Sequence, residues 1–406
     1  MTDDVGLIWR EQAPLVLTAL LRRSRDFDAC EDAVQDALVD AARSWPRSGV
    51  PDDPRAWLVR VASRRLVDRH RAEAARQRRE RVVVDPAATA PAADQPCVVV
   101  DHDDTLALML RCAHPDLTDA SRIALILRAV GGLSTAQIAA GFLVPEATMA
   151  QRISRAKATL RQADEPLPPA APHDVAARLD AVRTALSLIF TEGHTTSGGD
   201  RLLDLDLARE AIRLTERLHR ALPDDGETTG LLALMLLGAA RFDARSDEQG
   251  ELIPLEHQDR RRWDRAMIAR AVAMLESTLP VGPVGPFQLQ AAIAAVHAES
   301  PTAETTDWRQ ITVLYRMLDR IAPSPPVALN LAVAVGMADG PQAGLEALRR
   351  IESPVLERNH RFHAARAHLL ERDGQREPAR AAFLRAAELT RSIPEQRYLR
   401  RRAEIR

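Results

Sequence analysis

The stretch that decides the fold is GLSTAQIAAGFLVPEATMAQRISRAKATLR, residues 132–161, which reads as two short helices around a tight turn. Gly141 is expected to allow the turn, and Pro145 fits the first turn of the second helix, where its missing N–H costs nothing. Apolar residues at helical spacing are expected to face inward: Leu133, Ile138, Ala139, Val144, Met149 and Ile153. This pattern predicts a helix-turn-helix.

The second helix of this stretch carries an outward-facing polar and basic set. Its members are Thr148, Gln151, Arg152, Arg155 and Lys157. Side chains of these types hydrogen-bond base edges and phosphates in a DNA major groove. The alternative is an ordinary helix pair with a polar solvent face, because the same turn is a common packing device.

Residues 54–81 favour the nucleic-acid interpretation. They contain ten arginines against Asp68, Glu73 and Glu80, although the whole chain has 55 basic and 57 acidic side chains and a formal charge of −2. The buried side of this predicted helix is expected to consist of Trp57, Leu58, Val61, Leu66 and Val67. A basic strip that neutralises phosphates releases counterions and so gives salt-sensitive binding; a solvated surface with internal ion pairs is the alternative.

Residues 26–45, DFDACEDAVQDALVDAARSW, have the opposite character. Acidic residues surround an apolar stripe formed by Ala33, Val34, Ala37 and Leu38. An acidic helix does not grip phosphate, so it is predicted to dock on a basic protein partner.

The remaining composition indicates an all-α intracellular protein. Helical periodicity runs through almost every segment of the 406 residues, and three cysteines are too few for a disulfide framework. No signal peptide is visible, and the longest apolar run, at 230–240, is about half of the roughly 20 residues that a membrane helix needs. We therefore expect a cytoplasmic protein with no membrane contact.

Two segments rich in proline and alanine divide the chain. The predicted organisation is a first domain at 1–83, a linker at 84–100, a second domain at 101–162, a linker at 163–174 and a third domain at 175–406.

The third domain contains an internal repeat. Asp339 and Gly340 superpose on Asp373 and Gly374 at an offset of 34 residues, which is the tetratricopeptide (TPR) period. Small alanines and Gly374 predict a tight antiparallel helix pair, and residues 175–320 are expected to supply further degenerate pairs.

The order of acidic helix, basic helix, linker and helix-turn-helix resembles the extracytoplasmic-function (ECF) sigma factors of the sigma-70 superfamily. Residues 29–38, ACEDAVQDAL, resemble the helix that clamps the β′ coiled coil of RNA polymerase, and residues 56–71, AWLVRVASRRLVDRHR, resemble the element that engages and opens the −10 DNA. The resemblance implies two sets of binding residues. Polymerase is expected at Asp28, Glu31, Asp32, Gln35 and Asp36, and −10 DNA at Arg60, Arg64, Arg65, Asp68, Arg69 and Arg71.

Residues 117–157 are similar to the family's −35 reading domain, which implies −35 DNA contacts for the outward set named above, and the β flap as a further polymerase contact. The third domain resembles the long C-terminal extension of one sigma-factor group, through LIFTEGH (188–194), LEHQDRRRWDR (255–265) and LNLAVAVGMADGPQAGL (329–345). That extension ends in TPR-like helices and implies control of the sigma factor, either by folding over the sigma domains or by presenting a groove to a protein or small-molecule effector.

Other chemistries are weaker. Glu192, His194, His257 and Asp259 are residue types of acid–base or metal sites, and Cys97, His102, Cys112 and His114 could ligate zinc, but neither set has a recognised spacing. No enzyme activity, cofactor or metal is therefore predicted. Two alternatives stay open: a helix-turn-helix regulator that acts without polymerase, and a helical enzyme or scaffold.

Overall fold

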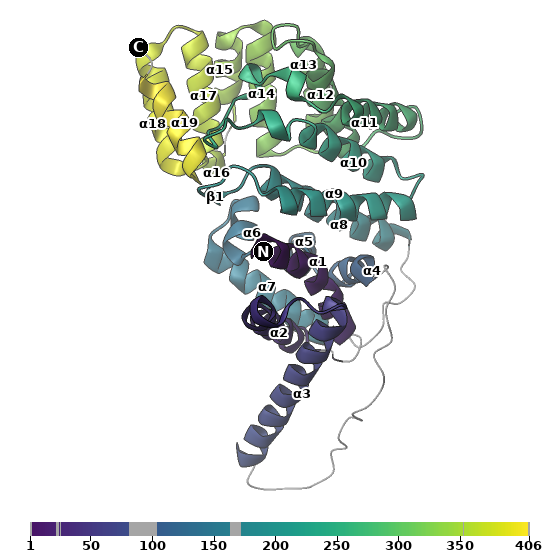
Figure 1. Ribbon diagram of the computed structural model, residues 1–406. Coiled ribbons are helices and arrows are strands. Elements are labelled where there is room, and N and C mark those ends of the chain that lie inside the picture. The colour runs from purple at the N-terminus through teal and green to yellow at the C-terminus, as the bar shows by residue number, and fades with distance from the viewer. Residues whose placement is uncertain are drawn as a thin grey trace. The chain divides into compact units, whose positions relative to one another are not determined.

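The computed structural model describes residues 2–21, 24, 26–80, 104–162, 172–351 and 353–404. The chain divides into two compact units, Met1–Ala185 and Leu186–Arg406 (Figure 1). Helices form nearly all of the described regular structure, so the prediction of an all-α fold is confirmed. The predicted linker at 84–100 lies outside the described residues, and the linker at 163–174 ends earlier than expected, because a helix begins at Pro172.

The first unit contains two groups of packed helices. In one group α1, α2 and α3 pack on one another, and in the other α5, α6 and α7 do so; α4 contacts α1 and α5, and α7 also contacts α2. The bounds are α1 Thr2–Leu21, α2 Phe27–Ser48, α3 Pro54–Glu80, α4 Asp104–Cys112, α5 Asp119–Ala129, α6 Thr135–Gly141 and α7 Glu146–Gln162. Helix α8, Pro172–His194, contains the division between the two units.

Local sequence signals fix the bounds of α2 and α3. The carboxylate of Asp26 accepts a hydrogen bond from the backbone N–H of Ala29 at 3.1 Å, and α2 ends at Gly49, which has a φ of 81°. Asp53 caps α3 in the same way, accepting from the N–H of Ala56 at 2.9 Å, and Pro54 stands at the first helical position.

The buried side of α3 differs in part from the prediction. Val67 was expected inside but is 44% exposed, whereas Val59 and Ala62 are buried with Leu58 and Leu66. An α-helix advances about 100° per residue, so Leu58, Ala62 and Leu66 share one stripe and Val67 turns away from it.

The helix-turn-helix forms as predicted, with one correction at the turn. Ser134 and Gln137 make a reciprocal capping box at the start of α6. Gly141 is the last residue of α6, and the residue in the left-handed region is Leu143, with a φ of 54°. The turn therefore depends on a strained leucine and not on the glycine. Pro145 directly precedes α7, and the predicted inward residues Met149 and Ile153 are buried.

The second unit is a succession of helices in which neighbours along the chain pack against each other, except that α15, besides its contact with α14, packs mainly against α17 and not against the short α16. Their bounds are α9 Leu205–Ala221, α10 Gly226–Ala239, α11 Arg265–Thr278, α12 Pro286–Glu299, α13 Trp308–Ile321, α14 Pro325–Asp339, α15 Pro341–Arg349, α16 Pro354–Glu357, α17 His360–Arg372, α18 Arg376–Leu389 and α19 Ile393–Glu404. Three single-turn 3₁₀ helices, at Phe242–Ala244, Leu255–His257 and Arg260–Arg262, lie between α10 and α11.

Glycines set the closest helix contacts of this unit. Gly340 and Gly374 both have positive φ, 103° and 75°, and each connects two packed helices, α14 with α15 and α17 with α18. Where α14 crosses α15, a Cβ on Gly344 would lie 2.6 Å from the Cα of Gly336. Two bare backbones therefore meet at this crossing.

The last helix of the unit is tied back to its first segments. Strand β1, Gly198–Gly199, pairs in parallel with β2, Arg391–Ser392, which directly precedes α19. The carboxylate of Glu251 accepts hydrogen bonds from Arg397 at 2.9 Å and from Arg401 at 2.7 Å, both on α19.

Candidate nucleic-acid interface

Helix α7 presents one polar face formed by four of the five residues predicted to read DNA. At 100° per residue, Thr148, Gln151, Arg152 and Arg155 fall within about 100° of one another. Thr148, Gln151 and Arg155 are exposed, and the guanidinium of Arg152 lies over the ring of Phe142, 5.6 Å from its centroid. The face combines hydrogen-bonding and cationic groups, which suits contact with bases and phosphates.

The expectation that Lys157 shares this face is wrong. Lys157 follows Thr148 by nine residues, which places it about 180° around the helix, toward α2. Its side chain is 12% exposed, and its Nζ lies 2.5 Å from the carboxylate of Glu31 and 2.9 Å from that of Asp28. Burial alone would lower the pKa of Lys157, but the hydrogen bonds to these two carboxylates hold that pKa above its usual value.

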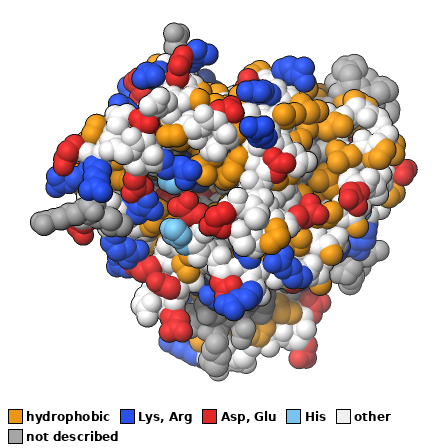
Figure 2. Space-filling view, turned by 90° about the horizontal axis from the view of Figure 1, so that it is seen from above, with side chains coloured by type: hydrophobic (Ala, Val, Ile, Leu, Met, Phe, Trp, Pro, Cys, Tyr) orange, Lys and Arg blue, Asp and Glu red, His pale blue; other side chains and the backbone are white. Residues whose placement is uncertain are grey.

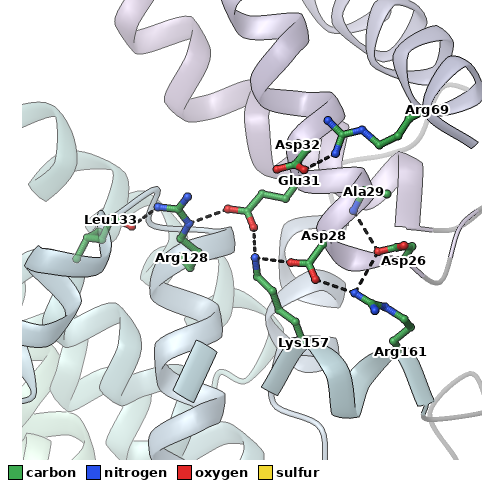
Figure 3. A network of polar contacts seen from close by, with 10 residues as sticks. All are labelled: Asp26, Asp28, Ala29, Glu31, Asp32, Arg69, Arg128, Leu133, Lys157 and Arg161. Atoms are coloured by element: carbon green, nitrogen blue, oxygen red, sulfur yellow. Dashed lines mark hydrogen bonds and ion pairs between the residues drawn. The ribbon is translucent and has the colours of Figure 1, made fainter. Parts of the chain in front are cut away.

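Glu31 lies at the centre of a cluster of ion pairs between α2 and the helices of the helix-turn-helix (Figure 3). One carboxylate oxygen accepts from Nε of Arg128 on α5 at 2.7 Å, and the other accepts from Lys157 on α7. Beside it, Arg161 donates to Asp28 at 2.7 Å. Glu31 was predicted to be a surface contact for a protein partner; in this arrangement it is 8% exposed and already paired.

A second set of ion pairs joins α2 to α3. Arg65 donates to Asp40 at 2.6 Å, and Arg69 donates to Asp32 and lies 3.7 Å from Asp36. The structure thus brings together two predicted sets, one acidic and one basic. All of these side chains keep substantial exposure, between 29% and 58%, so the pairs are surface pairs of small energy.

The basic surface of α3 that remains unpaired is a single stripe. Arg60, Arg64 and Arg71 are exposed, make no ion pair with another described side chain, and fall within about 40° of one another around the helix. Val67, the unexpectedly exposed apolar residue, lies in the same stripe. Phosphates and an unstacked base would meet positive charge and an apolar patch at this surface.

The outer surface of α2 is a separate stripe. Asp32, Gln35 and Asp36 are exposed there together with Val39, which is 46% exposed. An acidic stripe with an apolar centre is suited to a protein partner that offers basic side chains around an apolar contact.

Sequence reasoning missed the roles of Arg128 and Arg161, because their partners lie 97 and 133 residues away in the chain. The one sequence feature that could have pointed to this cluster is Lys157, because it is the one lysine among 55 basic residues.

The rival catalytic and metal sets do not assemble in the described part of the chain. No cluster of three or more His, Cys, Asp or Glu side chains there is arranged to hold a metal ion. Glu192 accepts from the backbone and hydroxyl of Ser197, at 3.1 Å each, and Asp259 caps a 3₁₀ helix and pairs with Arg261. Burial raises the pKa of the Cys112 thiol to about 12, so this thiol is inert at neutral pH. Cys97 and His102 lie outside the described residues.

Comparison with known families agrees with this geometry. Residues 8–76 match the model "Sigma-70 region 2", and residues 107–160 match "Sigma-70, region 4". These two regions define the class of the first unit: residues 8–160 carry the region 2 and region 4 domains of sigma-70 transcription initiation factors. Regions of this kind imply binding to core RNA polymerase and to promoter DNA.

The chain is 41% identical to an uncharacterised protein of Rhizobium meliloti over 411 residues, which cover 98% of this chain and 96% of the relative. It is also 28% identical over 163 residues to the probable ECF RNA polymerase sigma factor SigI of Mycobacterium tuberculosis. That match covers 39% of this chain and 55% of the relative, and supports membership of the ECF group.

The second unit has a different relationship. Residues 178–279 match a family of unknown function, DUF6596. The TPR resemblance of the C-terminal helices stays a prediction. No solved structure matches this chain. Among the described helices, none is long and apolar enough to cross a membrane.

Proposed function

We propose that this chain is an alternative sigma factor that acts in the cytoplasm, and that its second unit, a TPR-like helical array, controls it. In this proposal α2 docks on the β′ coiled coil of core RNA polymerase, the helix-turn-helix also meets the β flap, α3 engages −10 DNA, and α7 reads −35 DNA. The chain performs no chemistry, because polymerase synthesises the RNA.

The observation that carries the proposal is the separation of charge on the surface of the first unit. The exposed stripe of α2 is acidic, whereas the unpaired stripe of α3 and the polar face of α7 are basic. The chain therefore offers an acidic surface to polymerase and basic surfaces to promoter DNA.

The cluster around Glu31 adds a step to this mechanism. It joins α2 to α5 and α7, so the predicted polymerase contact Glu31 and the predicted DNA contact Lys157 neutralise each other. For either residue to bind polymerase or promoter, these ion pairs must first separate. The closed arrangement then lowers the affinity for both partners by the free energy of the cluster.

A reconstituted transcription assay tests the proposal. Core polymerase with the full chain should initiate at a cognate promoter, and comparison with a chain that lacks residues 186–406 measures the control exerted by the second unit. Because both substitutions place positive charge on the α2 stripe, Asp32→Arg with Asp36→Arg should abolish co-purification with core polymerase. Two reversals on exposed acids of the second unit, Glu276→Arg with Glu299→Arg, provide the matched control.

Retained co-purification of the α2 variant, or DNA binding with no promoter-directed transcription, would refute the proposal. The second result would identify a helix-turn-helix regulator that acts without polymerase.

A further inference from the structure

The second unit contains two cavities that are partly open to solvent, and residues of this unit line both of them. The larger has a volume of about 650 Å³ and includes Trp308, Phe383 and Tyr398 in its wall. The smaller, of about 330 Å³, includes Arg241. Leu255 and His297 line both cavities, so the two lie next to each other. Their volumes are those of sites that bind small organic molecules.

Three arginines lie beside these cavities: Arg245 and Arg260 are buried, and Arg241 is half-buried. The guanidinium groups of Arg241 and Arg260 lie near the ring of Trp263, 5.9 Å and 4.6 Å from its centroid. Arg260 donates to two backbone carbonyls, those of His297 and Ser300, at 2.6 Å each. Arg241, by contrast, donates its guanidinium N–H groups to no described residue and makes no ion pair with one.

Arg245 adds a second incompletely satisfied cation. It is 7% exposed, donates to Thr195 at 2.8 Å and contacts the ring of His194, but its Nε is buried without an acceptor. Burial and the neighbouring Arg260 lower the pKa of Arg241 to about 10, and burial with Arg241 and Arg361 lowers that of Arg245 to about 9. Both groups stay positively charged at neutral pH.

The nearby carboxylates have partners other than Arg241. Glu304 lines the larger cavity and hydrogen-bonds to Thr302. Glu395 lies 3.2 Å from His360 and accepts from Thr390 at 2.6 Å. Glu256 lies 3.7 Å from His257 and 4.0 Å from Arg402. The positive charge of Arg241 therefore has no counterion in the described part of this unit.

Arg241 is half-buried in the wall of the smaller cavity, and a cation in such a position is normally paired with an anion. We infer that the adjoining cavities bind a small organic anion, whose carboxylate or phosphate pairs with Arg241 and whose body lies against the aromatic wall. The anion supplies the acceptors that the arginines lack, because a guanidinium binds either oxyanion through paired hydrogen bonds.

The wall of the larger cavity fits an organic body better than a bare inorganic ion. His297 contacts Trp308 edge-on, with ring centroids 5.1 Å apart, and burial lowers the pKa of His297 to about 4. A neutral imidazole offers one donor and one acceptor beside an aromatic surface. Figure 2 shows one face of the molecule, on which basic, acidic and histidine side chains lie close to an area of hydrophobic ones; the larger cavity is lined by a similar mixture.

Binding of the anion is independent of the proposed transcriptional role. Only the further step, in which the anion reports a metabolic state to the first unit, rests on the proposed function. A binding assay on the full chain therefore tests anion binding alone, and its failure would leave the proposed transcriptional role unaffected.

The test uses thermal unfolding and isothermal titration calorimetry of the full chain with four probes: inorganic phosphate, benzoate, phenyl phosphate and the neutral analogue benzamide. Benzoate or phenyl phosphate should bind and raise the Tm of the second unit, and comparison of the two shows which oxyanion is preferred. Benzamide and inorganic phosphate should bind at least about tenfold more weakly, because benzamide lacks the negative charge and inorganic phosphate lacks the aromatic body.

Arg241→Met should remove the anion-dependent rise in Tm and raise the Tm of the ligand-free chain, because it removes a half-buried charge that has no counterion and lies near the like charges of Arg260 and Arg245. Arg309→Met, at an exposed arginine of α13, is the matched control and should change neither quantity. If Arg241→Met fails to fold, Arg241→Gln takes its place.

Three results would overturn the inference: no binding of either organic anion, binding that survives loss of the Arg241 charge, or inorganic phosphate binding as tightly as phenyl phosphate.

Discussion

Replacement of Glu31 by Gln should destabilise the first unit by about 2 kcal/mol. Removing one partner of a buried ion pair costs about 3–5 kcal/mol, because the other charge stays buried. Glu31 and Lys157 approach that limit, with side chains 11% and 12% exposed. Asp28 remains 2.9 Å from Lys157 in the variant and offsets part of the cost. At about 2–4 °C per kcal/mol, the Tm of this unit should fall by about 4–8 °C.

A double-mutant cycle with Lys157→Met isolates the pair. Scanning calorimetry of the wild type, the two single variants and the double variant should give a coupling energy of about 1–2 kcal/mol. Arg155→Met, at an exposed position of the same helix, should change the free energy of unfolding by less than about 0.5 kcal/mol.

Additive effects of the two substitutions would show that Glu31 and Lys157 are not paired in solution. The closed arrangement of α2 on α7, and the opening step that depends on it, would then be refuted. A coupling that vanishes at moderate ionic strength would have the same meaning, because a buried pair is screened little by salt.

Three further predictions concern single positions. Leu143→Gly should stabilise the helix-turn-helix by about 0.5–1 kcal/mol in denaturant unfolding, because glycine relieves the left-handed strain and the lost side chain is 38% exposed; a lower midpoint would contradict this. Gly344→Ala should lower the Tm of the second unit, because the added Cβ would lie 2.6 Å from the Cα of Gly336. Gly374→Ala is the comparison: a Cβ there meets no atom within 4 Å, so any fall in Tm measures only the strain of the positive φ. Burial lowers the pKa of His297 from 6.5 to about 4, so the unfolded chain holds this proton more tightly; the stability of the second unit should be full above pH 6.5 and decline from there to pH 4, and His297→Gln should flatten that decline.

The elements of the first unit could be predicted from the sequence because their signals are local. Helical spacing placed Met149 and Ile153 inside, and the spacing of Ala33 and Val34 gave the buried stripe of α2. The same periodicity places Lys157 opposite Thr148, so at this position the helical angle and the basic residue type point to different surfaces.

The contacts of the candidate site could not be predicted in the same way. Glu31 meets Arg128 and Lys157 across 97 and 126 residues, and no local rule relates such positions. The arginines beside the cavities could not be singled out for another reason: arginine supplies 54 of the 55 basic side chains, so an unusual arginine cannot be recognised from the sequence without its surroundings.

The parallel pairing of β1 with β2 has a consequence for how the second unit comes apart. In an open stack of helical repeats, the terminal repeat frays first and the opposite end does not register the loss. Here Arg391 and Ser392 hold Gly198 and Gly199, and α19 clasps Glu251. Helix α19 and β2 therefore stabilise the segment around Gly198, and proteolytic removal of α19 and β2 should also destabilise that segment. The second unit should unfold in one cooperative transition and not helix by helix from α19.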